Sequence, residues 1–265
     1  MENQKLRVAV VTGASSGMGA EFARRICMDA SFDFDEIWLI ARREVRLADL
    51  AKELPKPTRT LTLDLTDSIS YKAFALALEI NHAEVTLLIN AAGFGIFAHA
   101  TEIDFQTQLD MIDVNTKALT ALTALCIPCM EKGAAILNMC SLSSFQPVPY
   151  INVYAATKAY VLSYSRALGV ELRPRGVRVM AVCPGWVATE FFDIAEKDHP
   201  GAVPNKKPLW TAAQVITKAL KDFKRGRELS ILGFGVRAQA LLVKLLPYRL
   251  VMRIWMAQQG MARNR

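Results

Sequence analysis

The sequence predicts an α/β protein of the doubly wound type, with a seven-stranded parallel sheet flanked by helices. Three observations predict it. Short apolar runs recur from residue 6 to about residue 232, separated by longer stretches with helical spacing. The runs are almost wholly apolar, as expected for parallel strands that are buried on both faces. A glycine-rich turn follows the first run, where such folds bind ligands.

Seven apolar runs are the predicted strands. They are Leu6–Val11, Ile37–Ala41, Thr60–Leu63, Val85–Ile89, Ala134–Met139, Val177–Val182 and Leu229–Leu232. No linker-like segment, charge block or internal repeat divides them, so we expect one catalytic domain over residues 1–232. An apolar content of 52% in 265 residues is ample for its core.

The last part of the chain, residues 233–265, is predicted to be a basic, amphipathic helical extension. From Leu229 to Arg265 there are six Lys or Arg and no acid, so the net charge of +7 leaves +7 − 6 = +1 for the rest. Charges interrupt this segment too often for a spanning helix, but its composition suits a helix in a lipid interface. A helix that covers a pocket or a partner subunit is the alternative. Nucleic-acid binding is not expected, because a known reading motif is absent.

Five scattered cysteines indicate a reducing, cytoplasmic setting, with peripheral contact to a membrane surface left open. The pair Cys126 and Cys129 has no thioredoxin-like context, so we interpret both as packing residues. Three histidines offer no cluster for a structural zinc, so no metal is expected.

The turn after the first strand reads Thr12-Gly13-Ala14-Ser15-Ser16-Gly17-Met18-Gly19. Glycines let a phosphate approach the backbone, and the following helix would offer it unpaired N–H groups. The second strand ends in Arg42-Arg43, where an acid would bind a ribose 2′-hydroxyl. Arg42, assisted by Arg43 and Ser15, would instead bind a 2′-phosphate, so NADP(H) is favoured over NAD(H).

Tyr154 lies thirteen residues after Ser141, and Lys158 lies four residues after Tyr154. On a helix these two share one face, so the lysine charge would favour ionisation of the phenol. A phenol tuned in this way exchanges protons near neutral pH, which predicts carbonyl–alcohol redox chemistry.

Taken together, these motifs resemble the classical short-chain dehydrogenase/reductase (SDR) family over residues 5 to 232. The TGxxxGxG turn, Asp64-Leu65, Asn90-Ala91-Ala92-Gly93, Asn115, Ser141, Tyr154, Lys158 and Pro184-Gly185 follow the family order and spacing. The resemblance implies a Rossmann fold, an NADP(H)-dependent oxidoreductase and a homo-dimer or homo-tetramer.

The resemblance also implies roles for individual residues. Asp64 and Leu65 would hold the adenine, while Asn90, Ala91 and Gly93 would support the central strand and line the cofactor. Ala91 replaces the commoner second asparagine of the family motif. The nicotinamide would be contacted by Pro184, Gly185, Val187 and Thr189. Thr189 would bind the carboxamide group of the nicotinamide ring.

For catalysis, the resemblance makes Tyr154 the proton donor to the carbonyl oxygen and Ser141 a hydrogen-bond donor to the same oxygen. Lys158 would hold the nicotinamide ribose and lower the pKa of Tyr154, and Asn115 would position a water. Ser143 and Ser144 compete for the serine role, and the family spacing selects Ser141. An NADP(H)-binding regulator without turnover is the alternative function.

An irregular, proline-bearing stretch after Thr189 is predicted to be a substrate lid, reaching Trp210. Aromatic residues would line the substrate pocket, which favours a largely apolar carbonyl or alcohol, steroid-like or fatty. The candidate walls are Phe94, Phe97, Phe145, Tyr150, Trp186, Phe191 and Phe192.

Overall fold

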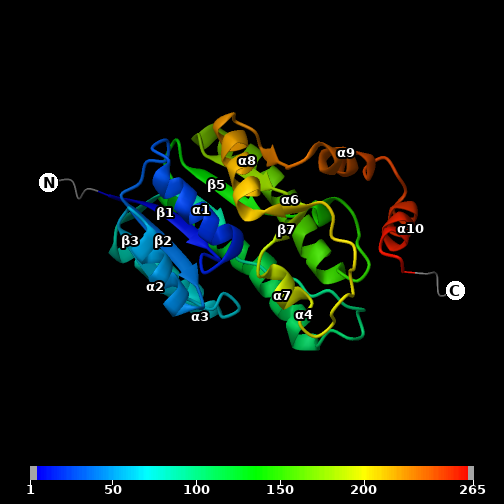
Figure 1. Cartoon of the computed structure of the whole chain (residues 1–265). Helices are drawn as coiled ribbons and strands as arrows, with labels where there is room; N and C mark the ends of the chain where they lie inside the picture. The colour runs from blue at the N-terminus through cyan, green and yellow to red at the C-terminus, as the bar shows by residue number, and fades with distance from the viewer. Residues whose placement is uncertain (1–4, 262–265) are drawn as a thin grey trace.

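Seven parallel strands form the central sheet of the computed structural model, which describes residues 5–261 (Figure 1). Across the sheet the strands run in the order β3-β2-β1-β4-β5-β6-β9, and every neighbouring pair is parallel. Their bounds are β1 Leu6–Thr12, β2 Glu36–Ala41, β3 Thr58–Thr62, β4 Ala83–Asn90, β5 Ala135–Met139, β6 Arg178–Val182 and β9 Leu229–Ser230. The predicted fold class is confirmed, with strand ends shifted by up to two residues.

Helices cover both faces of this sheet. One hydrophobic core lies between the sheet and α1 (Gly17–Met28), α2 (Glu44–Glu53) and α8 (Ala212–Lys224). The second lies between the sheet and α3 (Ser68–Ile80), α5 (Leu119–Cys126) and α6 (Asn152–Leu172). The remaining short helices are α4 Phe105–Ile112, η1 Asp113–Ala118, η2 Ile127–Cys129, η3 Leu142–Phe145, η4 Arg173–Arg175 and α7 Phe191–Ala195.

Alternation along the strands explains why both cores form. In β1, Val8 and Val10 enter one core while Ala9 and Val11 enter the other. Since successive strand side chains point to opposite faces, a wholly apolar strand is stable only between two helix layers. The near-continuous apolar runs of the sequence therefore predict a sheet that is covered by helices on both faces.

A second, two-stranded parallel sheet was not predicted. It pairs β7 (Trp186–Ala188) with β8 (Leu209–Thr211), in the segment predicted as a lid. Strands of three residues carry too few positions for an alternation pattern, so the sequence contains no signal for them. The pairing ties the two ends of the lid segment together.

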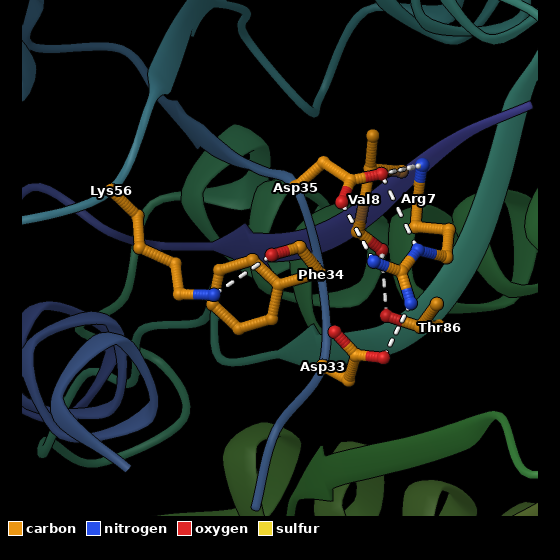
Figure 2. A network of polar contacts seen from close by, with 7 residues as sticks. All are labelled: Arg7, Val8, Asp33, Phe34, Asp35, Lys56 and Thr86. Carbon is orange, nitrogen blue, oxygen red and sulfur yellow. Dashed lines mark hydrogen bonds and ion pairs between the residues drawn. The ribbon is translucent and has the colours of Figure 1, made fainter. Parts of the chain in front are cut away.

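Ion pairs and hydrogen bonds join the amino end of β1 to the segment that leads into β2 (Figure 2). The guanidinium of Arg7 in β1 contacts Asp33 and lies 2.8 Å from Asp35, just before β2. The Asp35 N–H donates to the Arg7 carbonyl at 2.8 Å, and Lys56 donates to the Phe34 carbonyl at 2.8 Å. These contacts set where β2 starts and leave the carboxyl ends free for function.

The predicted C-terminal extension is a pair of helices, α9 (Phe234–Leu242) and α10 (Tyr248–Gln258), which we call the C-terminal arm. It lies at the end of the molecule away from β3 and α2 (Figure 1). Val236 and Ala240 of α9 and Val251 of α10 pack on Phe145 and Val161 of the body. No helix among residues 5–261 has the length and apolar character that a membrane span requires.

Candidate active site

The glycine turn leads from β1 into α1 and is shaped for close backbone approach. Gly13 has φ +66°, and a Cβ there would lie 2.7 Å from the Ala92 nitrogen. A Cβ on Gly19 would lie 2.3 Å from the Gly13 carbonyl oxygen, so only glycine fits. Ser16 precedes α1 without a side-chain cap, which leaves the helix N–H groups available to an anion.

Buried polar side chains tie the carboxyl ends of β1, β4 and β5 together. The Thr12 hydroxyl accepts the Ala91 and Ala92 N–H groups, each at 3.0 Å. Asn90 donates to Asn138 at 2.9 Å and to Thr123 at 3.0 Å. Asn90 thus links β4 to β5 and α5, and the contacts of Thr12 and Asn138 were not predicted from the sequence.

The two arginines after β2 separate in space. Arg43 donates to the hydroxyls of Ser15 at 3.0 Å and Ser16 at 2.7 Å, at the glycine turn. Arg42 is exposed and lies toward Asp64. Arg43 is therefore the arginine that lies next to Ser15. Arg42, which was predicted as the main ligand of a 2′-phosphate, lies farther along toward Asp64.

Glu190, unassigned by sequence, lies between two of these cations. Its carboxylate pairs with Arg43 at 2.9 Å and contacts Arg46. Hydrogen bonds from Arg46 and Arg43 hold the pKa of Glu190 at about 2. The start of the lid segment is thereby linked to α2 across the glycine turn.

Asp64 and Leu65 lie beside β3 as expected for an adenine site. Burial raises the pKa of Asp64, but hydrogen bonds from the Thr66 N–H and hydroxyl, and the Arg42 charge, more than offset it. The Asp64 pKa is lowered as a result, and Leu65 is buried. A carboxylate held ionised in this way is an acceptor ready for an amino or hydroxyl group.

The residues predicted to be catalytic meet where α6 begins. Lys158 is 4% exposed, donates to the Met139 carbonyl at 2.8 Å and lies 5.7 Å from the centre of the Tyr154 ring. Burial lowers the pKa of Lys158 to about 8. Burial also raises the pKa of Tyr154, a rise that a hydrogen bond with Ser141 only partly offsets. In this geometry Tyr154 is a neutral phenol at neutral pH, rather than one whose pKa Lys158 lowers.

The three clustered serines have different partners. Ser141 is the N-cap of η3, and its hydroxyl accepts the Ser143 N–H at 3.2 Å, while the Ser144 hydroxyl accepts the Ser141 N–H at 3.2 Å. The Ser143 hydroxyl is buried with no hydrogen-bond partner among the described residues. Of the three, only the Ser141 hydroxyl contributes to the pKa of Tyr154, which it lowers through a hydrogen bond.

Asn115 lies in the π-helical turn η1, a geometry frequent at functional sites. Its side chain donates to the Phe94 carbonyl at 2.8 Å and to Thr157 at 3.0 Å, and accepts the Phe94 N–H at 3.0 Å. These three bonds occupy the Asn115 amide in positioning the backbone after β4. The amide itself is therefore committed to protein partners.

Gly93 is required by this arrangement, because a Cβ there would lie 2.8 Å from the Asn115 Oδ1 and 3.2 Å from the Lys158 Nζ. We expect Gly93→Ala to lower the free energy of unfolding by about 1–3 kcal/mol through overpacking. Denaturant unfolding measures it. Gly235→Ala is the control, because nothing lies within 4 Å of a Cβ there, and an equal loss in both variants would contradict the prediction.

A cavity of about 380 Å³ joins the glycine turn to the catalytic side chains. Met18 of the glycine turn, Thr189, Ser141 and Tyr154 all line it. No described lining residue is acidic. The others are Phe97, Leu142, Ser143, Gln146, Val148, Ile151, Pro184, Gly185, Trp186, Val187, Phe191, Phe192, Asn205, Lys207, Pro208, Val236, Gln239, Trp255, Gln258 and Gln259.

Four predicted aromatic walls line this cavity, namely Phe97, Trp186, Phe191 and Phe192. The prediction is wrong for three others. Phe145 is buried under the C-terminal arm, Phe94 packs beside Met111, and Tyr150 stacks edge-on with His99. Phe145 and Phe94 thus pack in neighbouring hydrophobic clusters, and the partly buried Tyr150 ring packs on the exposed His99.

The C-terminal arm contributes to the wall of the cavity, and Trp255 is a wall residue that was not predicted from the sequence. Trp255 of α10 lines it and donates to the Pro149 carbonyl at 3.1 Å. The Gln259 amide accepts the Asn205 N–H at 2.8 Å and donates to the Asn205 carbonyl at 3.2 Å. The pocket-covering alternative for residues 233–265 thus describes the inner face of α10.

The comparisons with known proteins agree with this geometry. Residues 7–199 match the family described as short chain dehydrogenase. Sulfoacetaldehyde reductase 2 of Chromohalobacter salexigens is 35% identical over 190 residues, 69% of this chain and 74% of the reductase. The very-long-chain 3-oxoacyl-CoA reductase-A of Danio rerio is 31% identical over 230 residues, 82% of this chain and 69% of that protein.

Among solved structures, a short-chain dehydrogenase from Sphingobium yanoikuyae in complex with NADPH is similar. It is 30% identical, with a TM-score of 0.76 over 98% of this chain and 100% of that one. The similarity extends through the C-terminal arm, because nearly the whole chain is covered.

Proposed function

The chain belongs to the short-chain dehydrogenase/reductase family of NAD(P)-dependent oxidoreductases acting on alcohols and carbonyls, and from this premise we propose a more specific activity. Its cofactor is NADP(H), and its substrate is a largely apolar carbonyl or secondary alcohol. The observation that carries the proposal is the continuous cavity that runs from the glycine turn to Ser141 and Tyr154.

The residues at the glycine turn fit a dinucleotide. Gly13 and Gly19 leave space that a Cβ would fill, and the amino end of α1 is uncapped by a side chain. Arg43 and Arg46 add positive charge at the same end, where a phosphate would lie. When bound, NADP(H) would supply or accept the hydride of the reaction.

Tyr154 acts as the general acid in the direction of reduction. Its buried phenol is neutral, so it carries a proton that it can donate to a carbonyl oxygen. Ser141 donates a hydrogen bond to that oxygen and stabilises the developing negative charge. The Lys158 ammonium, which donates to the Met139 carbonyl, would hold the nicotinamide ribose of the cofactor.

Selection of NADP(H) over NAD(H) rests on Arg43 and Glu190. We expect Arg43→Gln to weaken NADPH binding by roughly 10- to 100-fold, because a charge-assisted hydrogen bond contributes about 1.5–3 kcal/mol. Glu190 competes with the phosphate for the same guanidinium, so Glu190→Gln is expected to strengthen NADPH binding by about two- to fivefold. NADPH and NADH fluorescence titrations measure both effects.

Arg173→Gln is the matched control for the two substitutions. This exposed arginine pairs with Glu228, away from the cavity. NADH binding should change by less than about twofold in all three variants, because NADH has no 2′-phosphate. Equal losses for the two cofactors in Arg43→Gln would contradict NADP(H) selectivity.

The substrate class follows from the cavity walls. Aromatic and aliphatic side chains dominate near Tyr154, while the amides of Gln239, Gln258 and Gln259 and the cation Lys207 lie among the lining residues. Such walls favour an apolar body with a polar or anionic far end. The relative that acts on very-long-chain 3-oxoacyl-CoA supports a fatty substrate.

The test follows NADPH oxidation by the purified full chain with steroid ketones, long-chain aldehydes, 3-ketoacyl thioesters and short charged aldehydes. Turnover of the bulky apolar carbonyls above the short charged ones is expected. Preference for the short charged aldehydes would overturn the substrate class. NADPH binding without turnover of any compound would favour the regulator instead. The homo-dimer or homo-tetramer stays a prediction of the family resemblance.

A further inference from the structure

The outer face of the C-terminal arm exposes six large apolar side chains. They are Phe234, Leu241, Leu242, Leu245, Leu250 and Ile254, with exposures from 42% to 89%. Single exposed apolar residues are ordinary on a protein surface, but a group along consecutive elements marks an interaction site.

Helix geometry separates these side chains from the arm's buried residues. In α9, Val236 and Ala240 face the body, whereas Phe234 and Leu241 are seven residues apart and lie on the opposite side. Leu245, in the turn that follows, is 81% exposed. α9 therefore exposes an apolar stripe to solvent, although the inner face of the helix is already buried against the body.

The second helix repeats the pattern. Val251 and Trp255 of α10 are buried against the body, one helical turn apart. Leu250 and Ile254 are exposed beside that inner stripe, at the same spacing. Both helices, which form one end of the molecule (Figure 1), thus expose apolar side chains to solvent.

Positive charge accompanies this apolar face. Lys244, Arg249 and Arg253 are exposed, and none of them forms an ion pair within residues 5–261. The chain has no acid after Glu228. A second copy of the chain docked through this face would bring like charges together, which disfavours such a dimer. A binding partner for the outer face of the arm must therefore combine an apolar surface with negative charge.

We propose that the outer face of the C-terminal arm binds the surface of an anionic lipid bilayer. Its leucines and Phe234 would enter the headgroup boundary, and its cations would pair with anionic headgroups, as in interfacial amphipathic helices. Trp255 and Gln258 of α10 line the cavity from the inner side of the same helix. Docking would therefore hold the cavity close to the bilayer, whatever reaction takes place in it.

The experiment measures co-flotation of the full chain with vesicles of phosphatidylcholine, alone or mixed with phosphatidylglycerol. The wild type is expected to float with the mixed vesicles and far less with the neutral ones. Replacing Lys244, Arg249 and Arg253 by Gln is expected to weaken that binding on the order of a hundredfold, because each cation near an anionic surface contributes about 1 kcal/mol.

Two further variants make the outcome specific. Lys72, Lys132 and Lys221 are exposed cations outside the arm, and their triple replacement by Gln should leave vesicle binding within about twofold. Leu241→Gln with Leu245→Gln, both at exposed positions, should weaken binding at least about tenfold.

Unchanged thermal unfolding would show that each variant is folded. No flotation of the wild type with anionic vesicles would overturn the proposal. If instead the leucine variants lowered the oligomer mass while the vesicles bound nothing, the face would be a subunit contact.

Discussion

Tyr154→Phe is expected to lower kcat for NADPH-dependent carbonyl reduction by on the order of 10²- to 10⁴-fold, the usual contribution of a positioned general acid. The substitution removes the phenolic proton donor beside Ser141 and keeps the ring that packs on Phe191 at a centroid distance of 5.3 Å. Cofactor binding and thermal stability should therefore change little. Stopped-flow NADPH oxidation and NADPH titration measure the two effects separately.

Tyr160→Phe is the matched control for this substitution. Tyr160 lies on the same helix, but its ring is 44% exposed and its hydroxyl hydrogen-bonds Thr120 at 2.9 Å, outside the cavity. Its turnover should match the wild type within about twofold. Loss of activity in both variants, or retention in Tyr154→Phe, would remove Tyr154 from the role of proton donor.

The fold could be predicted because its signals are local. A wholly apolar strand such as Ile37–Ala41 requires two helix layers, and glycines at positions 13 and 19 require a tight turn into a helix. The exceptions are short. β7 and β8, which were not predicted, have three residues each, which is too few for any periodicity to be recognised.

The site likewise contains residues whose proximity could be predicted from the sequence and residues whose proximity could not. Tyr154 and Lys158 are one helical turn apart, so their proximity follows from sequence spacing. Glu190 meets Arg43 across 147 positions, and Trp255 reaches the Pro149 carbonyl across 106, so only the tertiary fold brings these pairs together. Phe145 was wrongly predicted as a pocket wall because composition reveals that a side chain is aromatic but not which way it points.

Lys158→Met is expected to change activity and stability in opposite directions. Turnover should fall roughly 10²-fold or more, because the cation that would hold the nicotinamide ribose beside Tyr154 is removed. Stability near neutral pH should rise, because an ammonium that is only 4% exposed is replaced by an apolar side chain of similar length. Lys72→Met, at an exposed position on α3, is the control and should change neither quantity.

The pH dependence of the free energy of unfolding tests whether the buried Lys158 ammonium causes this difference in stability. The pKa of Lys158 is about 8 in the folded chain and 10.5 as the ordinary value, so the unfolded state binds more protons between them. The free energy of unfolding of the wild type therefore gains about 3 kcal/mol from this group as pH rises through that window. The Lys158→Met variant lacks this gain, so its advantage over the wild type should shrink with rising pH. Urea unfolding of both proteins from about pH 7 to about pH 10 measures this convergence, and parallel stability curves would show that Lys158 is already neutral or freely solvated in the folded protein.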